Sequence, residues 1–172
     1  MAQGRLRVAL DANVLVAGVR WPRWPHEVMR ATVRGVFDLV LPEQVVTEAR
    51  RHLGHPAQLA AFEAFLADSA YEAIAMPSVA LVRQSLDLVR SQKDMPIALA
   101  LLAGEADIFV TSDRDFTDPG AAADRFRQRV RIMLPAVFLR DVVGWSAEAL
   151  EAIRSRTWKE LMDEAGDPGE GV

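Results

Sequence analysis

The stretch RVALDANVLVAG, residues 7–18, is an almost unbroken apolar run that contains one carboxylate, Asp11. The apolar residues Val8, Ala9 and Leu10 come just before it, which is typical of a strand buried in a parallel sheet. In open α/β sheets, ligands bind beyond the carboxyl ends of the strands, and Asp11 stands at that position. Asp also ends strands by bonding to its own backbone in a turn. Taken alone, the stretch supports both interpretations of Asp11.

Apolar strands and amphipathic helices alternate along the rest of the chain. Strands are predicted at 6–10, 36–42, 107–113 and 129–135, with a short strand or extended link at 71–77. The Pro/Trp-rich connection RWPRWP leads from the first strand to a helix near 26–34, and further helices are predicted over 42–53, 57–68, 78–90 and 93–104. This alternation indicates an α/β fold, with a parallel sheet covered by helices on both faces.

The C-terminal region is predicted to be one helix, SAEALEAIRSRTWKELMDEAG, followed by the tail DPGEGV. This helix either caps the core or serves as a dimer or partner element. With no repeat or linker in the sequence, we expect residues 1–145 to form one domain on which residues 146–172 pack.

The composition narrows the class of protein. The chain has 172 residues, of which 51% are hydrophobic, a net charge of −4 and no cysteine, so a disulfide framework and a thiolate metal site are excluded. No apolar stretch is long enough to span a membrane and no signal segment precedes the first strand, which leads us to expect a cytoplasmic protein. The negative charge disfavours a general nucleic-acid coat. Nearly all basic residues are arginines, however, and arginine is well suited to binding phosphate.

Further acids could join Asp11 in one site. Asp113 also follows an apolar strand, in IFVTSDRDF, and Asp115 could take its place; either could be an ordinary loop acid. Asp94 precedes the helix at 93–104, where it could simply be the N-cap. Glu48 lies beside the apolar stripe of a helix that follows a strand, although most helical glutamates are solvated. If these acids converge, they form an oxygen-only site that suits Mg²⁺ or Mn²⁺ and phosphodiester hydrolysis.

Three motifs, in this order, resemble the PIN-domain (PilT N-terminus) family, especially the toxin-like branch of bacterial toxin–antitoxin systems. They are LDANVLVAG, the Glu of VVTEARRHL, and KDMPIALALLAGEADIFVTSDRDF, and the resemblance runs over about residues 5–140. It implies a Rossmann-like α/β/α sandwich and a Mg²⁺- or Mn²⁺-dependent endoribonuclease. The catalytic acids it implies are Asp11, Glu48, Asp94 and Asp113, and the metal ligands among them are Asp11, Asp94 and Asp113.

The resemblance also implies residues around the acids and partners for the chain. Asn13, Thr111 and Ser112 would support the acids or position substrate, and Asp115 matches a more variable acid of the same loop. The family commonly dimerises, its toxins bind a small antitoxin, and residues 57–90 would form a clip over the groove. Candidate RNA contacts, whose alternative is solvated surface or packing, are Arg20, Trp21, Arg23, Trp24, Arg50, Arg51 and Arg114.

Two other functions remain open at this stage. The first is a catalytically silent PIN-like module that binds or regulates a partner, although the full set of acids disfavours it. The second is a phosphatase that uses Asp11 as nucleophile. That chemistry usually needs a second acid two residues later, where this chain has Asn13, and a phosphate-binding lysine such as Lys93. The three histidines are expected to lie at the surface.

Overall fold

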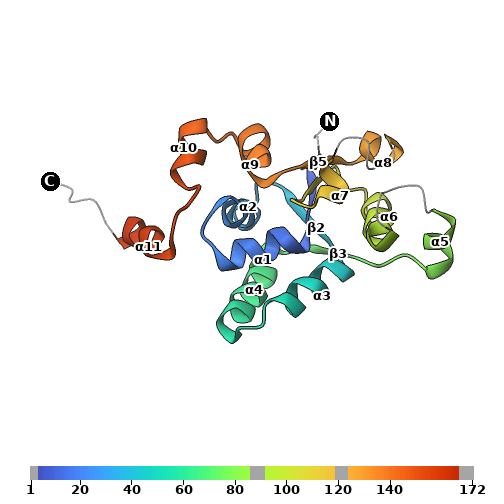
Figure 1. Ribbon diagram of the computed structural model, residues 1–172, viewed down its shortest axis with the longest axis horizontal. Coiled ribbons are helices and arrows are strands. Elements are labelled where there is room, and N and C mark those ends of the chain that lie inside the picture. The colour runs from blue at the N-terminus through green and yellow to red at the C-terminus, as the bar shows by residue number, and fades with distance from the viewer. Residues whose placement is uncertain (1–3, 86–91, 119–123, 167–172) are drawn as a thin grey trace.

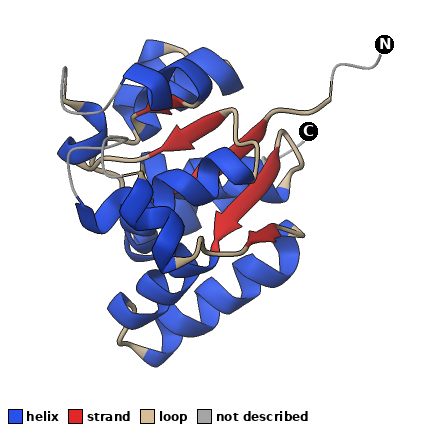
Figure 2. Cartoon of the chain, turned by 90° about the vertical axis from the view of Figure 1, so that its right-hand side faces the viewer, coloured by secondary structure: helices blue, strands red, loops and turns tan. Residues whose placement is uncertain are grey.

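The computed structural model describes residues 4–85, 92–118 and 124–166, and the strands of this part form one five-stranded sheet. Its order is β3-β2-β1-β4-β5, and every neighbouring pair is parallel. The strands are β1 (Arg7–Leu10), β2 (Asp38–Pro42), β3 (Glu72–Ile74), β4 (Ile108–Val110) and β5 (Arg131–Met133). Figure 2 shows them side by side and pointing the same way. The prediction of an α/β fold with a parallel central sheet is confirmed.

Helices cover both faces of this sheet, which completes the α/β/α sandwich (Figure 1). The helices α1 (Ala12–Arg20) and α2 (Trp24–Val33) lie on one face, and α6 (Met95–Ala103) packs against β2 and β3 on the other. The remaining helices before the C-terminal region are α3 (Glu43–His52), α4 (Pro56–Ser69), α5 (Val79–Gln84), α7 (Arg114–Thr117), α8 (Asp124–Arg129) and α9 (Pro135–Phe138), with a 3₁₀ turn η1 (Gln92–Asp94) and a π-helical turn η2 (Leu139–Val143). Leu10, Phe109 and Leu101 are among the fully buried side chains between the layers.

The segment that follows β1 forms a helix to which the sequence analysis assigned no element. Asp11 is the N-cap of α1, and its carboxylate accepts a hydrogen bond from the Ala12 N–H. Val14 and Val16 are β-branched and favour strands slightly, but both are buried, and burial outweighs that small preference. The chain therefore turns immediately after Asp11 and runs back as a helix over the sheet.

Two other predicted helices differ from the structure. The helix predicted over 78–90 is described only as α5, which Ser78 caps as expected, and residues 86–90 lie outside the described part. The helix predicted over 146–166 is two helices, α10 (Ala147–Ala152) and α11 (Trp158–Gly166). The break between them turns Ile153 and Arg156 inward, and both side chains are buried.

Residues 145–166, the C-terminal segment, are fastened to the connection between α1 and α2 (Figure 1). The Trp24 indole N–H donates to Leu150 O at 2.8 Å. The Trp158 ring meets the His26 ring edge-on, with centroids 5.1 Å apart. Burial lowers the pKa of His26. This histidine is half-buried and packs against Trp158, whereas we expected it to lie at the surface.

The strongest link in this fastening is a buried ion pair. Arg156 Nη2 lies 2.6 Å from Glu27 Oε1, and the two side chains are only 7% and 2% exposed. Arg156 Nε also donates to Pro22 O at 2.7 Å. Glu27 takes a second charged contact from Arg30 at 3.1 Å. A buried carboxylate that loses its main cationic partner is costly, so Arg156 holds this part of the fold together.

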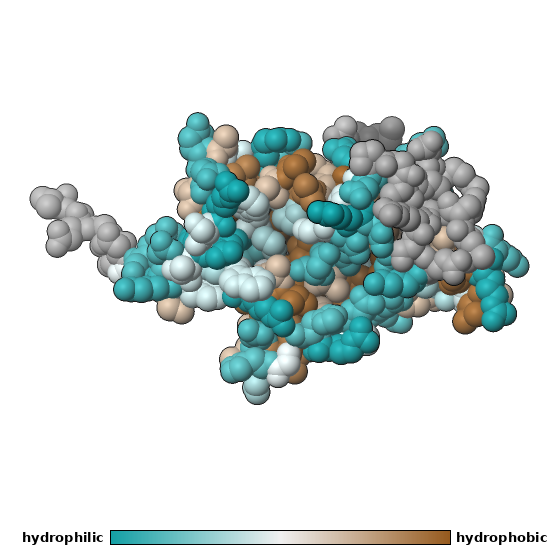
Figure 3. Space-filling model, in the orientation of Figure 1, coloured by the Kyte–Doolittle hydropathy of each residue, from teal (hydrophilic) through white to brown (hydrophobic). Residues whose placement is uncertain are grey.

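No helix in residues 4–85, 92–118 and 124–166 is long and apolar enough to cross a membrane. Figure 3 shows one face of the molecule, on which hydrophilic residues predominate and apolar residues form small patches near the middle.

We predict that Arg156→Ala lowers the free energy of unfolding by about 3 kcal/mol, because it leaves the Glu27 carboxylate buried beside Arg30 alone. Chemical denaturation followed by circular dichroism measures this loss. Arg154→Ala is the control, since Arg154 pairs with Glu151 at 3.5 Å through side chains that are 67% and 71% exposed. Equal stability of the two variants would contradict a structural role for the buried pair.

Candidate functional site

The candidate site lies where the strand order of the sheet reverses. From β1 the chain first proceeds outward to β2 and β3, and it then returns to the other side of β1 with β4 and β5. In folds of this kind, ligands bind outside the carboxyl ends of the strands at this switch point. Asp11 directly follows β1, and Asp113 lies three residues beyond β4. The Asp11 N–H donates to Val110 O at 3.0 Å, which ties the two strand ends together.

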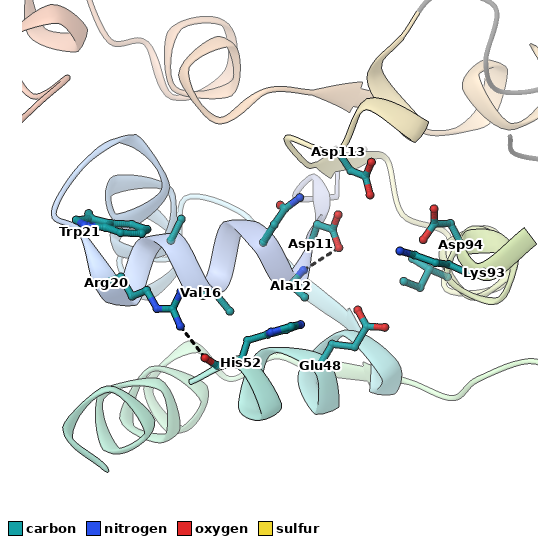
Figure 4. Close-up of a pocket in the computed structure, with 13 residues that line it drawn as sticks. Asp11, Ala12, Val16, Arg20, Trp21, Glu48, His52, Lys93, Asp94 and Asp113 are labelled. Atoms are coloured by element: carbon teal, nitrogen blue, oxygen red, sulfur yellow. Dashed lines mark hydrogen bonds between the residues drawn. The ribbon is translucent and has the colours of Figure 1, made fainter. Parts of the chain in front are cut away.

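A pocket of about 410 Å³ opens at this edge, and we refer to it as the acid pocket. The four acids predicted to be catalytic, Asp11, Glu48, Asp94 and Asp113, all line it. Figure 4 shows their carboxylates around one space, with Asp11 and Asp113 coming from the strand ends and Asp94 and Glu48 from either side. The other lining residues are Ala12, Asn13, Val16, Ala17, Arg20, Trp21, His52, Lys93 and Ile97.

Asp11 forms the buried floor of this pocket and is 7% exposed. One of its oxygens accepts a hydrogen bond from the Ala12 N–H at 2.8 Å, and the other accepts from the Thr111 hydroxyl at 2.7 Å. Burial raises the pKa of Asp11 to about 6. The two hydrogen bonds oppose this shift, and the charges of Asp113 and Asp94 add to it. A positive charge in the pocket would therefore stabilise the ionised form of Asp11.

Thr111, which was predicted to support the acids, connects two of them. Its side chain is completely buried, and its hydroxyl both donates to Asp11 and accepts from the Asp113 N–H at 3.0 Å. Asp113 then caps the short helix α7 by accepting from the Asp115 N–H at 2.9 Å. One hydroxyl thus links the Asp11 carboxylate to the backbone of Asp113.

Three acids come close enough together to share one cation. Single oxygens of Asp94, Asp113 and Asp115 all lie within 4.8 Å of one another. The expected ligand set was Asp11, Asp94 and Asp113, so the geometry brings in Asp115 where we expected Asp11. The reason is local: α7 turns Asp115 back toward Asp113, whereas both oxygens of Asp11 are engaged at the floor of the pocket.

Asp94 is only in part the helix cap that the sequence suggested. Asp94 occupies the N-cap position of α6, but among the described residues its side chain makes no capping hydrogen bond to that helix. The side chain is buried, at 6% exposure, and lines the acid pocket. A buried carboxylate in that position is better explained by the site than by the helix.

The remaining predicted site residues differ in whether they line the acid pocket. Glu48 is half-buried on α3 and accepts a hydrogen bond from the Gln44 side chain at 3.0 Å. Asn13 is exposed on α1 and lines the pocket, as expected of a group that positions substrate. Ser112 is exposed and is not part of the lining.

The structure adds two cationic or titratable groups that the sequence analysis did not assign to this site. Lys93, considered there only for the phosphatase alternative, lines the pocket beside Asp94 (Figure 4). His52, expected to be an ordinary surface residue, lines it as well. Glu48 and His52 are four residues apart on α3, which places them on the same side of the helix. That spacing was a usable signal.

The seven candidate RNA contacts separate into two groups. Arg20 and Trp21 line the acid pocket. The other five lie outside its lining: Arg23 and Trp24 bond to the C-terminal segment, Arg50 pairs with Glu63 at 2.6 Å, and Arg51 and Arg114 are exposed. Packing thus accounts for Trp24, whose indole N–H is used within the fold.

Comparisons with known proteins support the fold and go no further. No family model matches the sequence, and no curated protein matches it. The fold is similar to that in the crystal structure of PAE2754 from Pyrobaculum aerophilum, with a TM-score of 0.53 and 14% sequence identity over 81% of this chain and 97% of that chain. At this identity, the likeness shows the α/β/α fold alone.

We predict that Asp11→Asn stabilises the metal-free protein at pH 7.5. The pKa of Asp11 is about 6 in the folded protein and 3.8 for a free side chain. Above pH 6, the ionised Asp11 therefore lowers the free energy of unfolding by up to about 3 kcal/mol. The stability difference between variant and wild type should therefore shrink as the pH falls toward 4. Urea denaturation in EDTA at several pH values measures it.

An exposed acid provides the control for this measurement. Asp163 lies exposed on α11, so Asp163→Asn should be about as stable as the wild type. If Asp11→Asn were less stable than wild type at pH 7.5 without metal, ionised Asp11 would not destabilise the folded protein as predicted.

Proposed function

We propose that this chain is a divalent-metal-dependent endoribonuclease that acts as the toxin of a toxin–antitoxin pair, a function implied by its resemblance to the PIN-domain family. The observation that carries the proposal is the meeting of Asp11, Glu48, Asp94 and Asp113 in one pocket at the switch point of the sheet. These four acids come from four separate places in the sequence. The resemblance assigns the same four positions, in the same order, to the catalytic set.

The donor atoms fit a Mg²⁺ or Mn²⁺ ion. The three clustered acids supply only carboxylate oxygens, which are the ligands that these hard cations prefer. In an octahedral Mg²⁺ site with bonds of about 2.1 Å, neighbouring oxygens are about 3.0 Å apart and opposite oxygens about 4.2 Å apart. The oxygens of Asp94, Asp113 and Asp115 lie within 4.8 Å of one another, so side-chain rotations would have to draw them together around the ion. When bound, such an ion supplies charge neutralisation, activation of water and orientation of the phosphate.

The residues of the chain would share the remaining tasks. Thr111 holds the Asp11 carboxylate in place and fixes the backbone of Asp113. Lys93 and Arg20 stand in the lining of the same pocket and would contact phosphate oxygens of the RNA backbone. The acids would otherwise repel an RNA strand, so these two cations lower the electrostatic cost of bringing the backbone to the carboxylates.

The proposal extends to partners in the form that the resemblance implies. The substrate is RNA, the chain forms a homodimer, and a small antitoxin protein covers it until release. The α4 helix, which belongs to the segment expected to act as a clip, packs against α1 and α2. Residues 86–90 of that segment lie outside the described part of the chain.

We predict that purified protein cleaves single-stranded RNA with Mn²⁺ or Mg²⁺, and that EDTA stops this cleavage. Asp94→Asn should reduce the rate at least about 100-fold, because it removes a charged ligand from the cluster. Gel electrophoresis of an end-labelled RNA measures the rate, and Asp163→Asn is the control for loss of an exposed acid.

Three results would argue against this function. Full activity in EDTA would exclude the metal mechanism. Wild-type-like cleavage by Asp94→Asn would remove that residue from the site. A phosphorylated Asp11, trapped with a phosphate ester, would indicate the phosphatase alternative, and it would be detected by mass spectrometry.

A further inference from the structure

The acid pocket extends well beyond the acids, along one side of α1. The residues of this helix and its C-cap that line the pocket are Ala12, Asn13, Val16, Ala17, Arg20 and Trp21. Pairs of adjacent residues that recur every four positions lie on one face of a helix. From Ala12 to Arg20, that face runs for about 12 Å. Figure 4 shows the acids at one end of it and Arg20 with Trp21 at the other.

Trp21 at the far end is a large aromatic side chain that the fold leaves exposed. It is 47% exposed, although it lines a pocket. The indole N–H groups of Trp24 and Trp158 bond to the carbonyls of Leu150 and Arg20. Within the described residues, no comparable bond is found for the Trp21 indole. Packing and hydrogen bonding inside the protein therefore do not explain its position.

The backbone that carries Trp21 is nevertheless firmly held. The Trp21 N–H donates to Ala17 O at 2.9 Å, at the end of α1. On either side of Trp21, the Arg20 carbonyl accepts from Trp158 Nε1 at 2.9 Å and the Pro22 carbonyl accepts from Arg156 Nε at 2.7 Å. Both bonds come from the C-terminal segment, and Arg156 is itself buried. The indole is thus exposed on a fixed support, which reduces the entropy lost when a ligand stacks on it.

The charges around Trp21 favour a nucleic acid as the ligand. Arg20 Nη2 donates to His52 O at 2.7 Å, which holds the guanidinium group against α3. Both residues line the same pocket as Trp21. An aromatic face beside a guanidinium group offers stacking for a base and a cation for its phosphate, the combination used to bind single strands.

We propose that Arg20, Trp21 and His52 form a base subsite, in which an unpaired base of the RNA stacks on the Trp21 indole. The proposal rests on the endoribonuclease function: the scissile phosphate lies at the acids, and the stacked base belongs to the same strand about 12 Å away along α1. A base in a duplex has its faces covered by its neighbours, so the base subsite selects single-stranded RNA. Stacking on an aromatic side chain depends little on the identity of the base.

The test combines a protein variant with an altered substrate. The substrate is a single-stranded RNA octamer that the enzyme cleaves at one bond, together with a series in which one nucleotide at a time is abasic. In the wild type, an abasic nucleotide at one position should raise KM about tenfold with kcat unchanged. Trp21→Ala should raise KM for the intact octamer about tenfold, and the abasic nucleotide at that position should then have no further effect. Trp21→Phe should keep most of the wild-type affinity, since it retains an aromatic ring.

Two checks accompany these kinetics. Met162→Ala is the control for removing an exposed apolar side chain, because Met162 is 68% exposed on α11. Its KM should equal that of the wild type. Thermal unfolding should give the same midpoint for wild type, Trp21→Ala and Trp21→Phe.

The outcomes separate the base subsite from the proposed function. Suppose that the wild type cleaves the octamer, but the abasic nucleotide still raises KM in Trp21→Ala, or neither change alters KM. The base subsite is then overturned and the endoribonuclease function stands. If the wild type cleaves no RNA, the function fails, and fluorescence anisotropy of the labelled octamer decides the subsite. Weaker binding by Trp21→Ala would then support it, and equal binding would overturn it. If Trp21→Ala changes only the oligomeric state seen by light scattering, Trp21 belongs to a protein interface and the base subsite is overturned.

Discussion

The hydroxyl group of Thr111 joins the ends of the two strands on which the site depends. It donates to Asp11 at the end of β1 and accepts from the backbone of Asp113 beyond β4, and it does both without contact with solvent. The parallel register, which pairs Leu10 with Val110, brings these residues together. The register of the sheet therefore places Asp11 beside the segment that carries Asp113. The other two acids of the pocket are Glu48, on α3, and Asp94, at the start of α6.

Electrostatics gives this arrangement its chemical character. Burial and two neighbouring carboxylates oppose the ionisation of Asp11, and the hydrogen bonds from Thr111 and Ala12 compensate only in part. Those two carboxylates belong to Asp94 and Asp113, which each have an oxygen within 4.8 Å of one on Asp115. Collecting acids in this way costs stability in the folded protein, a compromise common at functional sites.

The sequence predicted the fold and the members of the acid pocket better than their detailed roles. Strand-end acids such as Asp11 and Asp113 could be recognised because parallel strands bring their carboxyl ends to one edge. The α1 helix was missed because the apolar run continues from the strand past Asp11 and includes the β-branched Val14 and Val16, and such a run fits a buried strand as well as a buried helix. The clustering of Asp115 depends on the turn of α7, and the burial of Arg156 depends on a break between α10 and α11. The break before α11 does carry a sequence pattern, because Thr157 and Glu160 form a capping box: the Thr157 N–H and hydroxyl both donate to the Glu160 carboxylate at 2.7 Å.

The fastening of the C-terminal segment has a consequence for how the molecule folds. Its contacts join residues about 130 positions apart, as in the bonds of Arg156 to Pro22 and Glu27, which span 134 and 129 residues. Closing so long a loop costs entropy that local contacts do not. The bond from Thr111 to Asp11 closes a loop of comparable size, since it spans 100 residues. Both the acid pocket and the fixed support of Trp21 therefore depend on contacts between residues far apart in the sequence.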